Sequence, residues 1–286
     1  MADIAATAAG RRWRKPPLIK SAKLRWGLYI GAAVYLILAS YSILADVNWL
    51  RVYEGLPRGA KFIGGFFPPF PFSSMLAEGS WAELAAQRMI DIGDGLVESL
   101  TMTVTSTVIG IFISVPIGLG AARNIAPLPV YLLCRGIIAI SRSFQEVIIA
   151  IFFVAMFGFG PFAGMLTLSF ATIGFLSKLL AEDIESMDPG QAEAIRATGS
   201  RWMQWINYGV QPQVMPRLIG LSLYRLDINF RESSVVGIVG AGGIGSTLVT
   251  AFDRYEYSTA ATILLIIIGI VFVAEYSSGK IRERLQ

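Results

Sequence analysis

The chain has 286 residues, of which 54% are apolar and 15% are charged, and its mean hydropathy is +0.59. A soluble domain carries about 25% charged residues, so this composition lacks the polar surface of a water-exposed fold and indicates a membrane protein. The chain has no histidine and a single cysteine, Cys134, which excludes intrachain disulfides, Cys/His zinc sites and nucleophiles activated by histidine. We therefore expect no catalytic residues and no metal site.

The first apolar run, Trp26–Ala45, predicts an extra first transmembrane helix. It has 20 residues without a charge, and at about 1.5 Å per residue it would cross the roughly 30 Å of hydrocarbon in a bilayer. By the positive-inside rule, a cytoplasmic N-terminus over 1–25 is predicted by seven basic residues: Arg11, Arg12, Arg14, Lys15, Lys20, Lys23 and Arg25. This flank accounts for the net charge of +4, so no nucleic-acid partner is expected. A cleaved signal peptide is the alternative, but its apolar core would be shorter, about 7–15 residues.

Residues 46–95 are predicted to be a periplasmic segment between the first and second crossings. They carry four basic and six acidic residues, and positions 66–72 contain only phenylalanine and proline. Proline breaks helices, and aromatic side chains favour the boundary between membrane and water. We therefore expect an ordered cap on the outer membrane surface rather than a separate domain.

The second and fourth crossings are predicted at 96–122 and 161–180. The second is rich in small and hydroxyl side chains, which suit close helix packing in lipid. The fourth leads into a charged cytoplasmic stretch.

The third crossing is predicted to run as one helix from near Pro127 to Phe157. The uncharged part at its end is too short to cross alone, so the helix must extend upstream through Arg142 and Glu146. These two residues lie four positions apart, on one helix face, where each charge can offset the other.

The fifth crossing, Val214–Val239, is charged in its first part and apolar at its end. Together with Arg142 and Glu146, its charges form a set of candidate ion pairs or pathway residues: Arg225, Asp227, Arg231 and Glu232. A charge at the centre of a membrane helix costs about 2.5–3.5 kcal/mol on insertion scales, so these side chains face protein or a watery cavity. Two interpretations stay open: pairs that fix this helix against its neighbour, or arginines that lend positive potential to an anion pathway.

The sixth crossing, Tyr257–Ala274, is uncharged and is followed by a basic cytoplasmic tail at 280–286. Six crossings return the C-terminus to the side of the N-terminus, in agreement with the basic residues at both ends. The sequence thus predicts an all-α integral membrane protein with six transmembrane helices and both termini in the cytoplasm.

A short helix is predicted at 189–200, in the cytoplasmic loop between the fourth and fifth crossings. Asp188 suits the N-cap, Pro189 suits the first helical position, Gln191 completes a capping-box pattern and Gly199 is placed to end the helix. With about 10 residues it is too short to cross the membrane. From the residues alone it is either a connector or a docking element.

This loop resembles the EAA loop of the permease subunits of binding-protein-dependent ABC importers, Glu-Ala-Ala-x-x-x-Gly followed by Ile-x-Leu-Pro. The resemblance implies that the helix docks into a cleft on an ATP-hydrolysing subunit and transmits its closure to the membrane helices. The expected ATPase-coupling residues are Glu193, Ala194, Arg196, Gly199 and Pro212. Three positions depart from the family's pattern: Ile195, Gly209 and Gln211.

Further segments resemble the phosphonate importer permeases. The similarity spans about residues 95–275 and implies that 96–279 is the permease domain, with the last five helices as a type I ABC importer permease (MetI-like) core. Where that family has Arg-x-x-Pro, this chain has Gln145 after Arg142, so the cargo within the phosphonate, phosphite and hypophosphite group stays open. The segments that carry the resemblance are Glu98–Thr103, Gly158–Gly164 and Arg231–Gly245.

The resemblance implies a permease that forms the translocation pathway of an ATP-driven importer in the bacterial cytoplasmic (inner) membrane. Expected partners are a second copy of the chain as a homodimer, or a related chain as a heterodimer, two ATP-binding subunits, membrane lipid, and a periplasmic or lipid-anchored substrate-binding protein. ATP and Mg would be cofactors of the ATPase and not of this chain. The alternatives are an importer of methionine or a similar small solute, a stand-alone secondary transporter, and an integral membrane enzyme.

Two glycine-rich patterns bear on nucleotide binding. Gly240-x-Gly242-x-x-Gly245 fits the dinucleotide-binding fingerprint, which requires a preceding strand, a following helix within a βαβ unit and an acidic residue about 20 positions on. Here a membrane helix precedes the glycines, the sequence does not indicate a following helix in such a unit, and Asp253 follows too soon, so we expect a tight turn or a close helix contact. The phosphate-binding pattern Gly-x-x-x-x-Gly-Lys-Ser/Thr does not occur, so the chain is not predicted to hydrolyse ATP.

Overall fold

The computed structural model describes residues 22–45, 49–64 and 80–285. Within these residues every regular element is a helix, as the composition predicts. The chain divides into two units, Met1–Gly59 and Ala60–Gln286. The phenylalanine and proline run at 66–72 and most of the basic N-terminal residues lie outside the described residues.

The first unit contains α2, Ala22–Ala45, and most of α3, Trp49–Gly64. α2 includes the predicted first crossing, and its apolar part is Trp26–Ser42. α3 has Pro57 inside it and ends in the second unit.

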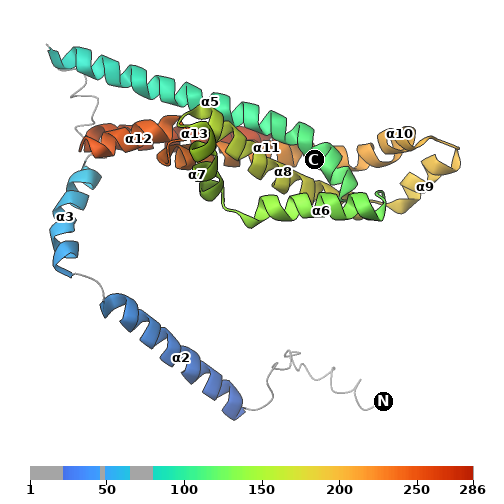
Figure 1. Ribbon diagram of the computed structural model, residues 1–286, viewed down its shortest axis with the longest axis horizontal. Helices are drawn as coiled ribbons and strands as arrows, with labels where there is room; N and C mark the ends of the chain where they lie inside the picture. Colours follow the sequence, from blue (N-terminus) through green and yellow to red (C-terminus); the bar gives the residue numbers. More distant parts are fainter. Residues whose placement is uncertain (1–21, 46–48, 65–79, 286) are drawn as a thin grey trace, which may run out of the picture. The chain divides into compact units, whose positions relative to one another are not determined.

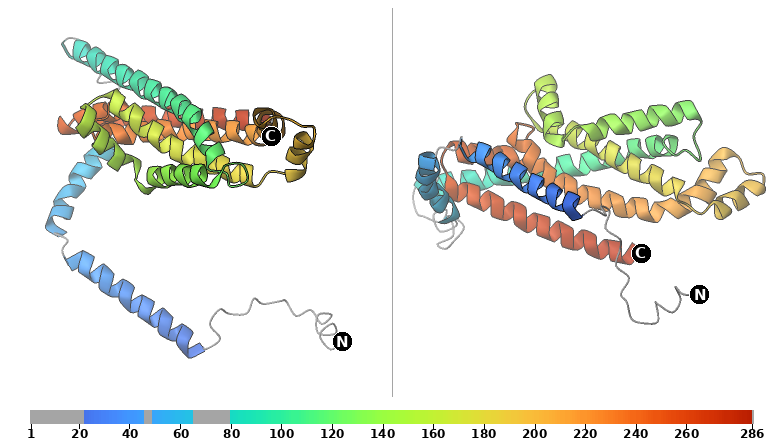
Figure 2. Two further views of the ribbon diagram at one scale, coloured as in Figure 1. Left: turned by 45° about the vertical axis from the view of Figure 1, so that its right-hand side comes forward. Right: turned by 90° about the horizontal axis from the view of Figure 1, so that it is seen from below.

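The second unit is a helical bundle with α8 packed against α5, α6, α7 and α11 (Figure 1). The short helices α9 and α10 lie at one end of this bundle and α12 lies toward the opposite end, as the views in Figures 1 and 2 show. The helices are α5 (Ser80–Gly120), α6 (Leu128–Ser143), α7 (Glu146–Phe157), α8 (Pro161–Glu185), α9 (Pro189–Ala197), α10 (Trp202–Trp205), the π-helix η1 (Ile206–Val210), α11 (Gln211–Ile238), α12 (Ile244–Asp253) and α13 (Tyr257–Leu285).

Helix α5 begins at Ser80, well before the predicted start of the second crossing at residue 96. No proline interrupts the sequence between Ser80 and Pro116, so nothing ends the helix at the predicted boundary. The later part of the predicted periplasmic segment is therefore a helical extension of the second crossing.

The prediction of one continuous third crossing is wrong. α6 ends at Ser143, Phe144 and Gln145 are extended, and α7 starts at Glu146 with its axis bent by 94° from α6. Arg142 therefore lies in the last turn of α6 and Glu146 in the first turn of α7. A cation near a helix C-terminus and an anion near a helix N-terminus each stabilise their helix by interacting favourably with its dipole. The spacing of Arg142 and Glu146 therefore suits a break between two helices as well as one continuous helix.

The glycine-rich stretch after α11 forms the tight turn that was expected, and an additional helix, α12, follows it. Gly240, Gly242 and Gly243 have φ of 90°, 80° and 74°, a region that glycine adopts without strain. A Cβ added at Gly245 would overlap the carbonyl oxygen of Ser234 on α11, so glycine is required where α12 returns against α11. Helix α12 was not predicted from the sequence.

Three helices within the described residues are long and apolar enough to cross a membrane: Met89–Gly120, Pro161–Glu185 and Thr259–Lys280. The bent pair α6 and α7 makes a fourth candidate. α11 is long enough, and its charged residues set it apart from these helices. The second unit is therefore a helical membrane protein with three or four candidate spans.

Candidate functional site

The predicted cytoplasmic helix is present as α9 and begins as the sequence indicates. The Asp188 carboxylate accepts a hydrogen bond from the Gly190 N–H at 2.9 Å, and Pro189 occupies the first turn. The helix ends at Ala197, and Gly199 follows with φ of 80°. These features are the N-cap and the left-handed glycine exit of a short autonomous helix.

Of the two hydrogen bonds in the predicted capping box, the one to the Gln191 side chain is wrong. The backbone N–H of Asp188 donates to Oε1 of Gln213 at 3.0 Å, a residue of α11, and not to Gln191. Gln213 also donates from Nε2 to the carbonyl of Gly209 at 2.8 Å. A side chain that is distant in sequence but adjacent in space therefore takes the place of the local glutamine.

One face of α9 is anchored to the segment that follows it. Ala192 is buried, and its carbonyl accepts a hydrogen bond from Nε1 of Trp205 at 2.8 Å. The guanidinium of Arg196 lies over the ring of Trp205, 5.3 Å from its centre, in a cation–π contact. These contacts hold α9 against α10 and η1 and leave its other face open.

Each of the predicted coupling residues is exposed to solvent, although Arg196 also contacts Trp205: Glu193, Ala194, Arg196, Gly199 and Pro212. Large apolar side chains nearby are exposed as well, with 55% of Trp202, 61% of Met203 and 70% of Tyr208 accessible to solvent. An exposed aromatic and apolar surface beside a short projecting helix is typical of a protein interaction site.

One departure from the EAA pattern has a structural explanation. Ile195 turns inward and packs on the apolar cluster beneath α9, so a larger side chain than alanine fits there. A Cβ at Gly209 would lie 3.4 Å from Cα of Ala192 and 3.4 Å from Cδ1 of Trp205, which are ordinary contact distances, so packing does not require glycine there. Gln211 is exposed and no contact explains it.

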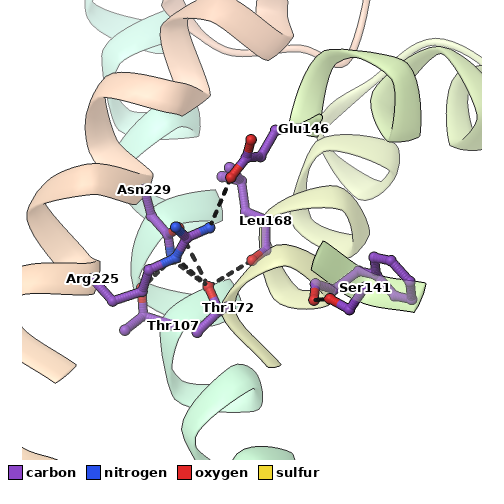
Figure 3. A network of polar contacts seen from close by, with 8 residues as sticks. Thr107, Ser141, Glu146, Leu168, Thr172, Arg225 and Asn229 are labelled. Carbon is purple, nitrogen blue, oxygen red and sulfur yellow. Dashed lines mark hydrogen bonds and ion pairs between the residues drawn. The ribbon is translucent and has the colours of Figure 1, made fainter. Parts of the chain in front are cut away.

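A second polar site lies inside the bundle around Arg225 of α11 (Figure 3). Its guanidinium donates from Nε to Oγ1 of Thr172 at 3.1 Å and forms an ion pair with Glu146 at 3.5 Å. It also lies over the ring of Phe175, 5.5 Å from its centre. Since Arg225 is only 3% exposed, these contacts replace the water that its charge would otherwise require.

Asn229 lies next to Arg225 and extends this network to α5. Its Nδ2 donates to Oγ1 of Thr107 at 2.8 Å and to Oγ1 of Thr172 at 2.9 Å. The Thr172 hydroxyl donates in turn to the carbonyl of Leu168 at 2.6 Å. The network joins α5, α7, α8 and α11 in the interior of the bundle (Figure 3).

The remaining predicted charges are arranged differently. Arg231 and Asp227 form the predicted ion pair at 2.8 Å, with the Arg231 side chain 50% exposed and Asp227 buried. Glu232 is partly buried and interacts electrostatically with Glu146, Arg225 and Arg231. Arg142 is exposed and does not pair with Glu146, because Glu146 pairs with Arg225 instead.

Sequence reasoning missed Thr107, Thr172 and Asn229. Thr107 belongs to the hydroxyl-rich run of the second crossing, which suggests packing more than a specific partner. The available signal was the position of Asn229 four residues after Arg225, on the same helix face. Within the described residues, no group of His, Cys, Asp and Glu could hold a metal ion.

Three motifs that are distant in sequence meet at the end of the bundle opposite α9. Glu98 accepts the Gly243 N–H at 2.7 Å and Ser99 accepts the Ile244 N–H at 2.9 Å, so both cap the N-terminus of α12. The Gly160 N–H donates to the carbonyl of Gly240 at 3.0 Å. An open groove of about 310 Å³ lies beside this junction, lined by Glu98, Thr101, Met102, Thr105, Pro161, Phe162 and Met165.

Residues 114–284 match the protein family described as "Binding-protein-dependent transport system inner membrane component". The chain belongs to this family. It is therefore the membrane-embedded permease component of a transport system that depends on a binding protein, and not its ATPase.

Relatives agree with this assignment, and a solved structure shares the fold. "Phosphite transport system permease protein PtxC" of Stutzerimonas stutzeri is 34% identical over 290 residues, which cover 99% of this chain and 98% of that protein. "Phosphate-import permease protein PhnE" of Mycolicibacterium smegmatis is 42% identical over 197 residues, but these span 68% of this chain and only 37% of that relative. The permease chain of the MetNI methionine ABC transporter shares the fold, with a TM-score of 0.61, 23% identity and coverage of 69% of this chain and 97% of that chain.

Proposed function

We propose that this chain is the permease subunit of an ATP-driven importer for phosphonate or a related phosphorus oxyanion such as phosphite or hypophosphite. The observation that carries the proposal is the 34% identity to the phosphite permease PtxC of Stutzerimonas stutzeri over nearly the full length of both chains. The methionine permease of Vibrio cholerae is 23% identical over 202 residues, so methionine transport is the weaker alternative.

We propose six crossings, with α2 as the extra first one and the last five as a type I importer core. The crossings beyond α2 would be α5, the bent pair α6 and α7, α8, α11 and α13. The charged residues of α11 lower its hydropathy below that of an ordinary transmembrane helix. Two of them, Arg225 and Asp227, are paired with other charged residues inside the protein. Paired charges that face protein are tolerated at membrane depth, which supports counting α11 as a crossing.

The pathway would run between two copies of this chain, with two ATPase subunits on the cytoplasmic side and a binding protein outside. ATP and Mg would bind the ATPases, since this chain has no phosphate-binding loop. Closure of the ATPases would draw the two α9 helices together and switch the side of the membrane to which the pathway opens. The exposed face of α9, with Glu193 and Ala194, supports this docking role.

Within this mechanism the three candidate arginines would play different parts. Arg225 is buried and fully engaged, so it would position α11 rather than meet the cargo. Arg231 and Arg142 have exposed side chains and would supply positive potential to a pathway for an anion.

Uptake by the reconstituted assembly tests this proposal. Proteoliposomes that hold the permease, its ATPase and its binding protein should accumulate labelled phosphonate, phosphite or hypophosphite only when ATP is present. A purified permease should also bring its ATPase with it at equal stoichiometry. Uptake driven by an ion gradient without ATP would indicate a secondary transporter, and uptake of methionine alone would overturn the assignment of the cargo.

A further inference from the structure

Gln213 connects two segments that the proposed mechanism must move together. It lies in the first turn of α11, directly after Pro212. Its Oε1 accepts the backbone N–H of Asp188 at 3.0 Å, at the N-cap of α9. Its Nε2 donates to the carbonyl of Gly209 at 2.8 Å and reaches the carbonyl of Asp188 at 3.4 Å. One amide therefore bonds both to the start of α9 and to the π-helix η1.

The other end of α9 is attached to the same following segment. Trp205 donates to the carbonyl of Ala192 and stacks with Arg196, as described above. Gly209 lies close to Ala192, since a Cβ built on it would be in van der Waals contact with Cα of Ala192 at 3.4 Å. Both ends of α9 are thus held to α10, η1 and the start of α11.

The attachment of α9 to the preceding helix is of another kind. The turn between α8 and α9 contains only Ser186, Met187 and Asp188, and the Ser186 hydroxyl bonds back to the carbonyl of Asp183 within α8. Leu180 and Ile184 of α8 share an apolar cluster with Ala192. Apolar burial is non-directional, whereas hydrogen bonds fix direction and distance.

The segment that Gln213 braces includes a π-helical turn, Ile206–Val210. Such turns are rare distortions and are found often at functional sites. A hinge at this point would absorb displacement of α9 before it reached α11 unless something spanned it. The Gln213 side chain bypasses it, since Gln213 follows the turn in α11 and bonds directly to Asp188 at the start of α9. Its second bond, to Gly209, holds the side chain against the turn itself.

We propose that Gln213 is a positioning residue that transmits displacement of α9 to α11, and through α11 to the Arg225 network, by bridging the π-helical turn. This inference rests on the proposed function, because it assumes that an ATPase moves α9. It assigns a mechanical role to a residue outside the EAA pattern.

The test measures cargo imported per ATP hydrolysed in the reconstituted full assembly. Gln213→Met keeps the length and helix propensity of the side chain but loses all three hydrogen bonds, and it should lower this ratio by at least about fivefold, the lower end of typical coupling between sites. Gln213→Glu keeps the acceptor for Asp188 and loses the donor to Gly209, so its ratio should fall between those of the wild type and Gln213→Met. The matched control is Gln211→Leu, an exposed neighbour with no contact that explains it, which should leave the ratio unchanged.

Each outcome decides the inference separately from the proposed function. If the wild-type assembly shows no ATP-dependent uptake, the proposed function fails first. If the wild type imports cargo and both Gln213 variants keep its ratio of cargo to ATP, the proposed function stands and the role of Gln213 is refuted. If Gln213→Met does not assemble, Gln213→Leu, which also lacks all three hydrogen bonds, takes its place, since an unchanged ratio in that variant refutes the bridge.

Discussion

The α9 region and the Arg225 network use polar residues in opposite ways. On α9 the charged Glu193 is exposed and the helix is held by one buried alanine and by bonds from its backbone to the side chains of Trp205 and Gln213. Around Arg225 the polar side chains are buried and bond to one another across four helices. The comparison shows that α9 leaves polar side chains such as Glu193 available to a partner, whereas the network inside the bundle engages its own.

The two regions should also differ in which amino-acid substitutions they tolerate. Exposed residues on α9 can change without affecting folding, so their loss should appear in coupling. Buried residues of the bundle should affect stability before transport. The following variants test this division, from the largest expected effect to the smallest.

Gly245→Ala should destabilise the bundle most, by about 3 kcal/mol or more, because overpacking here has no soft neighbour to yield. A Cβ at this position would overlap the backbone oxygen of Ser234 and crowd Gly237. Thermal unfolding in detergent measures the loss. Gly269→Ala on α13 is the control, since nothing lies within 4 Å of a Cβ there. Equal stability of the two variants would contradict the tight contact of α11 and α12.

Arg225→Met should cost about 2–3 kcal/mol, because it leaves the carboxylate of Glu146 without its partner, a loss reduced by the 26% exposure of that side chain. The double variant Arg225→Met with Glu146→Gln should recover part of this stability. Thermal unfolding of both single variants and the double variant gives the coupling energy. Strictly additive effects would show that the pair does not interact.

Gly199→Val should cost about 1–2 kcal/mol at the end of α9, because φ of 80° is unfavourable for a side chain with a Cβ. No atom lies within 4 Å of an added Cβ, so the effect would come from backbone strain alone. Coupled transport should fall while the protein still inserts into the membrane. Gly199→Asn is the control, because asparagine tolerates this conformation. Full transport by Gly199→Val would contradict the claim that the left-handed conformation at the end of α9 is needed for coupling.

Trp205→Phe should have the smallest effect, about 1 kcal/mol, because it loses the hydrogen bond to Ala192 and keeps the aromatic ring. Thermal unfolding should show a modest shift that the exposed Trp202→Phe does not show. A larger loss of thermal stability in Trp202→Phe than in Trp205→Phe would contradict the claim that Trp205 holds α10 against α9.

Much of the α9 region could be predicted from the sequence because its signals are local. Asp188, Pro189 and Gly199 mark the start and the end of α9 within a short stretch, and each acts as predicted. The N-cap partner Gln213 could not be predicted, because it comes from the next helix and no local pattern encodes that contact.

The membrane region was harder to predict because its decisive contacts join distant residues. The spacing of Arg142 and Glu146 fits both one helix and a break, and only the position of Arg225 shows which partner Glu146 takes. The helix after the glycine turn was missed because its N-terminus is capped by Glu98 and Ser99, which lie in α5. Helix content was predictable, and the pairing of polar groups was not.

The claim that α9 is the element that binds an ATPase subunit can be tested most directly by site-specific cross-linking. The one native cysteine, Cys134, is buried, so an introduced cysteine on the surface reacts without background. Ala194→Cys on the exposed face of α9 should cross-link to the ATPase subunit of the assembled importer, and Phe159→Cys at the opposite end of the bundle should not. A cross-link from Phe159→Cys alone, or none from Ala194→Cys in an assembly that hydrolyses ATP, would contradict the account.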